Sequence, residues 1–259
     1  MTRIVFLGTA AALPTEDRDN TYLAVIGDAP GSNLLIDCGG GTYRSLLRAG
    51  IGANSLDDLF ITHAHIDHIG SLPSLIESFR LGGRRRPLRI YAIPEVLAVA
   101  ESILHVFNYE LTLDHWAYEV TLHAVEPDQP LTLAGVDAHT YRMDHTVPCA
   151  GLRLNFPTGA LAYTCDTQPN PTIAELGKDA RLFITECTFL DKSAAQARTS
   201  RHMTALEAGQ QAALCGVDTL ALVHLGVAEG WTPADARTEA AQAFSGAIVV
   251  PQDGDALEM

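Results

Sequence analysis

Apolar residues in the first part of the chain gather in short runs bounded by glycine, proline or polar residues, which is the pattern of buried strands. Between these runs apolar residues recur at helical spacing, and glycines end two of the helical segments, as is common at helix C-termini. The pattern predicts strands at residues 3–8, 22–26, 33–37, 58–61 and 88–92, and helices at residues 42–49, 69–81 and 94–107.

The middle of the chain changes character and reads as successive strands separated by glycine, proline and aspartate turns. Strands and helices then alternate again, and one helix opens with a capping box from Thr204 to Glu207. We expect strands at residues 120–125, 131–133, 136–143, 150–156, 160–164, 182–186, 219–224 and, as the last, 248–250, with helices at residues 204–215 and from 232 onward. No long linker or repeat interrupts the pattern, so we predict one α/β domain over residues 1–259, with two mixed sheets and helices outside.

Composition narrows the class of protein. The hydrophobic content of 47% is enough for a sizeable core, and no apolar run reaches transmembrane length. The N-terminus leads directly into a strand, so we expect no signal peptide. The five cysteines are an odd number without paired spacing, which indicates a reducing compartment and a cytoplasmic protein. A formal net charge of −14 argues against a broad nucleic-acid-binding face, which would be basic.

One short stretch, residues 63–68, carries three histidines and one aspartate, directly after a predicted strand. The carboxyl ends of strands are where α/β proteins usually bind ligands. His63 and His65 are two positions apart, so both point the same way in an extended segment, and Asp67 and His68 follow where the chain turns. A surface loop has no need of so many donors, and a core would bear the cost of burying them unpaired. The stretch therefore indicates a site for zinc, with manganese or iron as alternatives.

Three further candidate ligands each end or follow a predicted strand: His145, Asp166 and His224. Each alone is more simply explained as a polar residue at a strand terminus, but with the histidine cluster they complete two metal sites. We expect two Zn²⁺ ions per chain, one held by His63, His65 and His145, the other by Asp67, His68 and His224, with Asp166 bridging them.

The motifs resemble the metallo-β-lactamase superfamily, and within it the branch of ribonuclease Z (tRNase Z) and related phosphodiesterases. The resemblance runs along nearly the whole chain. Besides the His-x-His-x-Asp-His motif with its Leu72-Pro73 ending, it rests on Gly8-Thr9, Asp37-Cys38-Gly39-Gly40-Gly41, Asp144-His145, Glu186-Cys187-Thr188-Phe189 and Arg201-His202-Met203-Thr204. It implies an αββα sandwich of two mixed sheets with outer helices, two zinc ions, and hydrolysis of phosphodiesters.

The resemblance also implies roles for individual residues. A metal-bound hydroxide would attack the phosphodiester, and Asp67 would orient it or take its proton. A pair formed by Glu186 and His202 would protonate the leaving oxygen, with Glu186 fixing the imidazole and raising its pKa. Asp37 would accept a hydrogen bond from a metal-bound imidazole.

We expect the substrate to be a small or nucleotide phosphodiester. One alternative is a tRNA 3′-end endonuclease, which uses the same chemistry but needs an RNA-binding surface. The acidic charge disfavours RNA, and the interval between His145 and Asp166 is too short for the protruding tRNA-binding arm of bacterial ribonuclease Z. Another alternative is a hydrolase of carboxylic esters, thioesters or lactones. We expect no membrane partner, and a homodimer is compatible with the sequence.

The remaining histidines and several aromatic residues are expected at the surface or in ordinary packing. They are His105, His115, His123, His139, Trp116, Tyr118 and Trp231.

Overall fold

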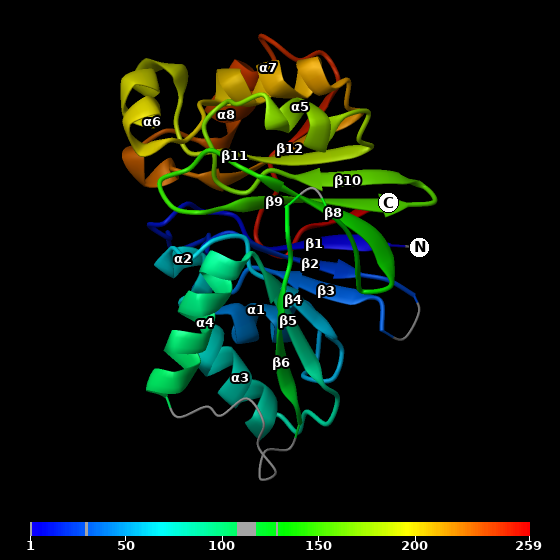
Figure 1. Cartoon of the computed structure of the whole chain (residues 1–259). Helices are drawn as coiled ribbons and strands as arrows, with labels where there is room; N and C mark the ends of the chain where they lie inside the picture. The colour runs from blue at the N-terminus through cyan, green and yellow to red at the C-terminus, as the bar shows by residue number, and fades with distance from the viewer. Residues whose placement is uncertain (1, 29–30, 108–117, 128) are drawn as a thin grey trace.

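The computed structural model describes residues 2–28, 31–107, 118–127 and 129–259, and it consists of two packed β-sheets with helices on both outer faces (Figure 1). This αββα arrangement confirms the predicted fold class. In the described part of the chain each sheet contains seven strands. The N- and C-terminal strands lie side by side in the first sheet, because the strand nearest the C-terminus pairs with the first strand of the chain.

The first sheet is mixed. Its strands, in spatial order, are β14 (Ala256–Glu258), β1 (Arg3–Gly8), β2 (Tyr22–Ile26), β3 (Asn33–Ile36), β4 (Asp58–Phe60), β5 (Leu88–Ala92) and β6 (Val120–Ala124). The pairs from β14 to β3 are antiparallel, and those from β3 to β6 are parallel.

The second sheet repeats this division. Its strands, in spatial order, are β13 (Ala247–Val249), β12 (Thr219–Leu225), β11 (Leu182–Cys187), β10 (Gly159–Tyr163), β9 (Ala150–Phe156), β8 (Val136–Arg142) and β7 (Pro130–Leu133). The pairs from β13 to β10 are parallel, and those from β10 to β7 are antiparallel. Each sheet therefore has parallel strands whose carboxyl ends can carry ligands.

Helices form the two outer layers. The first sheet is covered by α1 (Thr42–Arg48), α3 (Leu72–Leu81) and α4 (Pro94–Val106), and the one-turn α2 (Ile66–Ile69) lies near the junction of the sheets (Figure 1). The second sheet is covered by α5 (Thr172–Gly177), α6 (Ala194–Ser200), α7 (Ala205–Cys215) and α8 (Pro233–Ala240). The capping box predicted at Thr204 and Glu207 is present at the start of α7.

Central strands are buried on both faces, because one face meets a helix layer and the other meets the second sheet. In β1 every residue after Arg3 is buried, and in β11 every residue is buried. This explains why these segments read as continuous apolar runs. The outer strand β8 instead alternates, with Ala138 and Thr140 buried between less buried neighbours. The spacing of apolar residues in a strand therefore indicates whether the strand is covered on both faces or on one.

Three differences from the predicted elements have physical causes. Asp67 and His68 lie inside α2, which is separate from α3, because Pro73 lacks an N–H and favours a new helix start. Residues 248–250 are predicted as the last strand, but β14 follows them. The three residues of β14 do not alternate between apolar and polar in the sequence, and they are extended because they pair with β1. The short helices α5 and α6 were not predicted, because neither is long enough to show a periodic apolar face.

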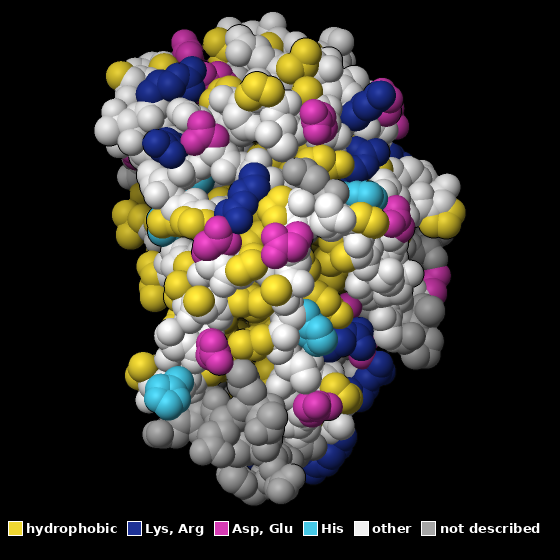
Figure 2. Space-filling model, in the orientation of Figure 1, with side chains coloured by type: hydrophobic (Ala, Val, Ile, Leu, Met, Phe, Trp, Pro, Cys, Tyr) yellow, Lys and Arg dark blue, Asp and Glu magenta, His cyan; other side chains and the backbone are white. Residues whose placement is uncertain are grey.

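The surface carries mixed charges. On the face shown in Figure 2, Lys and Arg side chains are interspersed with Asp and Glu rather than gathered in one broad basic area. Among the described residues, no helix combines the length and the apolar character needed to cross a bilayer.

Candidate metal centre

Side chains from both sheets meet at one edge of the sandwich, where several strands end. In the first sheet, β3 leads into Asp37 and β4 leads into the histidine cluster. In the second sheet, Asp166 follows β10, and His224 lies near the end of β12. Because each of these positions is fixed by a buried strand, the donors are held by the rigid part of the fold.

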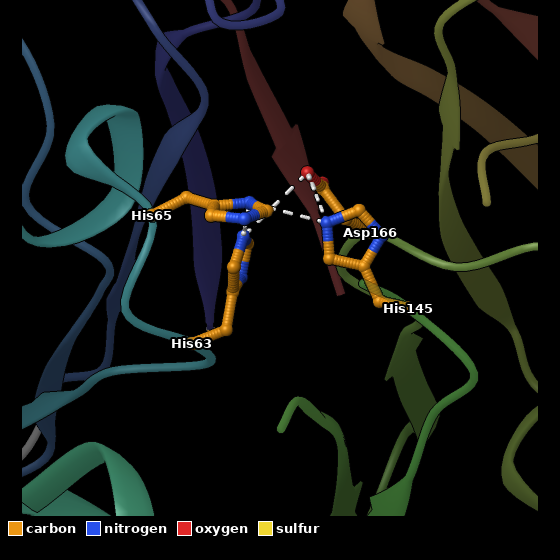
Figure 3. Close-up of side chains that lie close together, drawn as sticks. All are labelled: His63, His65, His145 and Asp166. Carbon is orange, nitrogen blue, oxygen red and sulfur yellow. Dashed lines mark hydrogen bonds and ion pairs between the residues drawn. The ribbon is translucent and has the colours of Figure 1, made fainter. Parts of the chain in front are cut away.

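The first group of donors contains His63, His65, His145 and Asp166, which point toward one another (Figure 3). Nδ1 of His65 lies 3.1 Å from Nε2 of His63 and 3.2 Å from Nε2 of His145. Oδ2 of Asp166 lies 3.7 Å from Nε2 of His63 and 3.9 Å from Nε2 of His145. These distances leave one central point that all four atoms face.

The second group contains Asp67, His68, Asp166 and His224. Oδ2 of Asp67 lies 3.4 Å from Nε2 of both His68 and His224. Oδ2 of Asp166 lies 3.4 Å from Nε2 of His68 and 3.2 Å from Nε2 of His224. Asp166 thus belongs to both groups, and the structure brings together all seven residues that the sequence nominated as ligands.

This donor set fits metal ions. Nε2 of His68 and Oδ1 of Asp166 are buried and have no hydrogen-bond partner among the described residues. Two buried carboxylates face each other across ring nitrogens, an arrangement that needs a cation between them. Burial lowers the pKa values of His63, His65 and His145, so these rings are neutral, which is the form that binds metal.

The second nitrogen of each ring is used to orient it. Nδ1 of His68 donates to Oδ2 of Asp37 at 2.8 Å, as the sequence predicted for Asp37. Nδ1 of His63 donates to Thr62 Oγ1 at 3.0 Å, and Nε2 of His65 donates to Thr146 Oγ1 at 3.4 Å. Nδ1 of His145 donates to the Arg201 carbonyl at 3.1 Å, and Nδ1 of His224 donates to Thr188 Oγ1 at 2.8 Å. These acceptors fix the tautomers, so that the lone pair of the opposite nitrogen faces the centre.

The loop that carries Asp37 is tightly fitted against the cluster. Besides His68, its carboxylate accepts hydrogen bonds from the backbone N–H and the hydroxyl of Thr62, at 2.8 and 2.9 Å. A side chain at Gly39 would collide with the carbonyl oxygen of Asp67, so only glycine allows this close approach. Asp37 and His224 themselves have positive φ values of 64° and 53°, a conformation that non-glycine residues adopt rarely.

A carboxylate–imidazole pair lies beside the second group. Oε1 of Glu186 accepts hydrogen bonds from Nδ1 of His202 and from the backbone N–H of Thr167, both at 2.8 Å. Oε2 of Glu186 accepts from the Thr188 hydroxyl at 2.7 Å. The His202 ring stacks on that of His224, with centroids 5.3 Å apart. The pair predicted from the sequence is therefore assembled next to the proposed ligands.

Burial alone would lower the pKa of His202, but the nearby carboxylates reverse the effect. Glu186 acts most strongly, with smaller contributions from Asp166 and Asp67, and together they raise the pKa of His202 to about 9. The ring is thus protonated at neutral pH. Glu186, His202 and His224 also form a third group of donors close enough to hold an ion, but Nδ1 of His202 is already engaged by the Glu186 carboxylate.

Several residues of the site were missed from the sequence. Thr62 directly precedes His63 and Thr146 directly follows His145, so a hydroxyl next to a candidate histidine ligand was an available signal for both. The Arg201 carbonyl and Thr188 carry no such signal, because any residue has a carbonyl and Thr188 meets His224, 36 residues away, only in the folded chain.

The residues expected in ordinary packing lie away from the centre where they are described. Trp231 and Tyr118 are buried, His105 is exposed, and His123 stacks on Tyr91. His139 is partly exposed, and His115 and Trp116 lie outside the described residues.

Comparison with known proteins places this geometry in a family. A family model described as Anti-Pycsar protein Apyc1 matches residues 2–216. A ribonuclease Z from Natronomonas pharaonis is 30% identical over 99% of this chain and 97% of its own length, and one from Halorubrum lacusprofundi is 27% identical over the same shares.

Solved structures share the fold. The metallo-β-lactamase fold protein YhfI from Bacillus subtilis superposes with a TM-score of 0.85 at 24% identity, covering 99% of this chain and 98% of that protein. The short form of human tRNase Z superposes with a TM-score of 0.77 at 22% identity, with the same coverage. The chain therefore belongs to the metallo-β-lactamase superfamily of metal-dependent hydrolases, in the group that contains the ribonuclease Z proteins and the Anti-Pycsar protein Apyc1 family.

Proposed function

We propose that this chain is a dinuclear-metal phosphodiesterase that acts on small or nucleotide phosphodiesters. The observation that carries the proposal is the Glu186–His202 pair, joined at 2.8 Å and stacked on the ligand candidate His224. A phosphodiester with an alkoxide leaving group needs a proton donor at this place, whereas an activated ester does not. The names of the relatives, which are ribonuclease Z proteins, support cleavage of a phosphodiester.

Two ions would be held as the donor groups suggest. His63, His65 and His145 would bind one ion, Asp67, His68 and His224 the other, and Asp166 both. Imidazole and carboxylate donors suit zinc best, with manganese or iron as alternatives. When bound, such a pair of ions supplies hydroxide at neutral pH and neutralises charge on the phosphoryl oxygens.

Asp67 would act on the attacking water. Its Oδ2 lies 3.4 Å from Nε2 of His68 and 3.4 Å from Nε2 of His224, and the residue belongs to the short helix α2. Burial opposes its ionisation, but hydrogen bonds and charge from His224 and His68 hold the pKa of Asp67 well below its ordinary value. A carboxylate that stays ionised can orient the water and accept its proton.

His202 would protonate the leaving oxygen from Nε2. Its Nδ1 is fixed on Glu186, so the opposite nitrogen carries the proton that can be transferred. The side chain is 14% exposed, which leaves the ring reachable from the substrate side. The raised pKa, about 9, keeps the donor charged at neutral pH.

The described surface favours small substrates over RNA. The segment between His145 and Asp166 is taken up by β9 and β10, with no inserted arm. The net charge is −14, and the face in Figure 2 has no broad basic area for phosphate contacts. Cleavage at the tRNA 3′ end is the second candidate, because relatives that match over 97% of their length are named ribonuclease Z.

A substrate panel tests the proposal. The zinc-loaded protein is assayed with bis(p-nitrophenyl) phosphate, a cyclic nucleotide, a dinucleotide, a precursor tRNA and a lactone. We expect turnover of the small diesters and weak, micromolar or poorer binding of the tRNA. Sub-micromolar, salt-sensitive binding and cleavage of the tRNA would promote the second candidate. Turnover of the lactone without any diester would contradict phosphodiester chemistry. Gel filtration with light scattering in the same preparation would show whether the chain forms the homodimer that the sequence allows.

A further inference from the structure

Arg201 occupies a backbone position that arginine rarely takes. It caps the C-terminus of α6 with φ 54° and ψ 52°, in the left-handed region. Helices usually place glycine or asparagine at such a cap, because other side chains crowd the following carbonyl. A non-glycine residue kept in this conformation suggests that its side chain has a use.

The backbone role of Arg201 does not require arginine. Its carbonyl oxygen accepts the hydrogen bond from Nδ1 of His145 at 3.1 Å, which orients a proposed metal ligand. Glycine would supply the same carbonyl and would adopt the same φ without crowding. The reason for an arginine must therefore lie in its guanidinium.

The guanidinium is held at the rim of the centre. Nη1 donates to the carbonyl of His145 at 3.0 Å and to Oδ1 of Asp144 at 3.2 Å. Asp144 is itself fixed, because Oδ2 accepts from Nε2 of Gln168 at 2.6 Å. The Arg201 side chain is 50% exposed, and among the described residues its Nε and Nη2 make no hydrogen bond. A cation is thus positioned with donors still facing solvent.

The contacts of the Arg201 guanidinium also relate it to the proposed metal site. It bonds to the backbone carbonyl of His145, whereas the Nε2 atom at the far end of the same side chain faces the donor cluster. The guanidinium is thus bonded to the backbone of His145, and the ring of His145 lies 4.9 Å from that of His202, the proposed proton donor, which follows Arg201 directly in the chain. This proximity to the proton donor favours the leaving-group side of a bound diester as the part of the substrate that Arg201 would meet.

We propose that Arg201 binds a second phosphate of the substrate, located on the leaving-group side of the scissile diester. This rests on the proposed phosphodiesterase function and narrows it to phosphodiesters that carry a neighbouring phosphate, such as phosphorylated dinucleotides and short oligonucleotides. Arginine suits this task because its planar fork matches phosphate oxygens, and hydrogen bonds between charged groups are the strong ones.

The test compares the dinucleotide TpT with its 5′-phosphorylated and 3′-phosphorylated forms in the zinc-loaded protein. We expect one phosphorylated form to have a KM about tenfold or more below that of TpT, as a charge-assisted hydrogen bond provides. Arg201→Gly should lose this preference, measured as the ratio of the KM values for the phosphorylated dinucleotide and TpT within the variant, while keeping zinc content and thermal stability, because the carbonyl remains and the left-handed backbone suits glycine. Arg201→Lys should keep part of the preference.

Arg48→Gln, which removes an exposed charge from α1, serves as the control and should leave the preference unchanged. An equal preference in wild type and Arg201→Gly would overturn the inference. So would loss of zinc and of TpT turnover together in Arg201→Gly, which would assign the side chain a structural role. If wild type cleaves all three dinucleotides without preference, the inference alone fails. If it cleaves none of the dinucleotides but turns over bis(p-nitrophenyl) phosphate or a cyclic nucleotide, this inference alone fails. If it cleaves no phosphodiester at all, the proposed function and this inference both fail.

Discussion

Glu186, which is buried, and His202, which is partly exposed, form an ion pair in which one carboxylate oxygen accepts the imidazole Nδ1–H at 2.8 Å. The other oxygen of Glu186 is held by Thr188, whose hydroxyl also accepts the hydrogen bond from Nδ1 of His224 at 2.8 Å. One hydroxyl therefore links the proposed proton donor to a proposed metal ligand.

Replacing His202 with alanine should slow substrates with basic leaving groups far more than activated ones. General acid catalysis is worth about 100- to 10,000-fold, so turnover of a nucleotide diester should fall by roughly that factor. A nitrophenolate leaves without protonation, so an aryl diester should lose much less. Steady-state kinetics on both substrates, with zinc analysis, checks this.

Two controls accompany that variant. Glu186→Gln should show the same pattern more weakly, since Glu186 only orients and charges the ring. Zinc content should stay at the wild-type value in both variants. Equal slowing of both substrates would mean that His202 grips the phosphate, and loss of an ion would mean that it is a ligand.

Activity on nucleotide diesters should fall in alkaline solution. The donor must be protonated, and its pKa is raised to about 9, so the active form is complete at neutral pH and is lost as the pH rises through about 9. Rate profiles for wild type should bend downward there, whereas His202→Ala should show no such bend. For Glu186→Gln the bend should move to lower pH, because the charge that raises the pKa is gone. An unshifted bend in that variant would speak against the pair.

Asp166→Ala should remove both metal ions, because Asp166 belongs to both donor groups. Elemental analysis of fully loaded wild type should give about two ions per chain, and the variant should give close to none. Wild type should also melt at a higher temperature with zinc than with a chelator, since a ligand that binds only the folded state stabilises it. Asp137→Ala, an exposed position on β8, is the matched control. One ion or none in loaded wild type would refute the dinuclear assignment.

Thr188→Val should weaken binding of the ion at His224. The substitution keeps the shape but removes the hydroxyl that accepts from Nδ1 of His224, and loss of such a partner typically costs about 10- to 100-fold in metal affinity. Competition with a chelator dye measures the two affinities separately, and Thr188→Ser should restore the weaker one. Wild-type affinity for both ions in Thr188→Val would show that His224 is oriented by its packing alone.

The fold was largely readable from the sequence, because strands covered on both faces form continuous apolar runs and because α7 and α8 begin with capping boxes. The candidate ligand set was readable for a different reason: buried donors such as His63, His68 and Asp166 would have no structural use without a cation. What stayed hidden depends on the third dimension. β14 is extended only because β1 offers an open edge, and the Arg201 carbonyl meets His145 only after two distant segments pack together.

The pairing of β14 with β1 and the spread of the donors along the chain set an order of events on the ribosome. The histidine cluster at residues 63–68 emerges early, long before Asp166 and His224. In a nascent chain, the early donors are therefore exposed to metal ions before Asp166, the carboxylate shared by both donor groups, has been synthesised. Hydrolytic competence can arise only after β12 has been synthesised, and the first sheet keeps an open edge until residues 256–258 follow. Translation itself thus delays the activity until the second sheet is nearly complete.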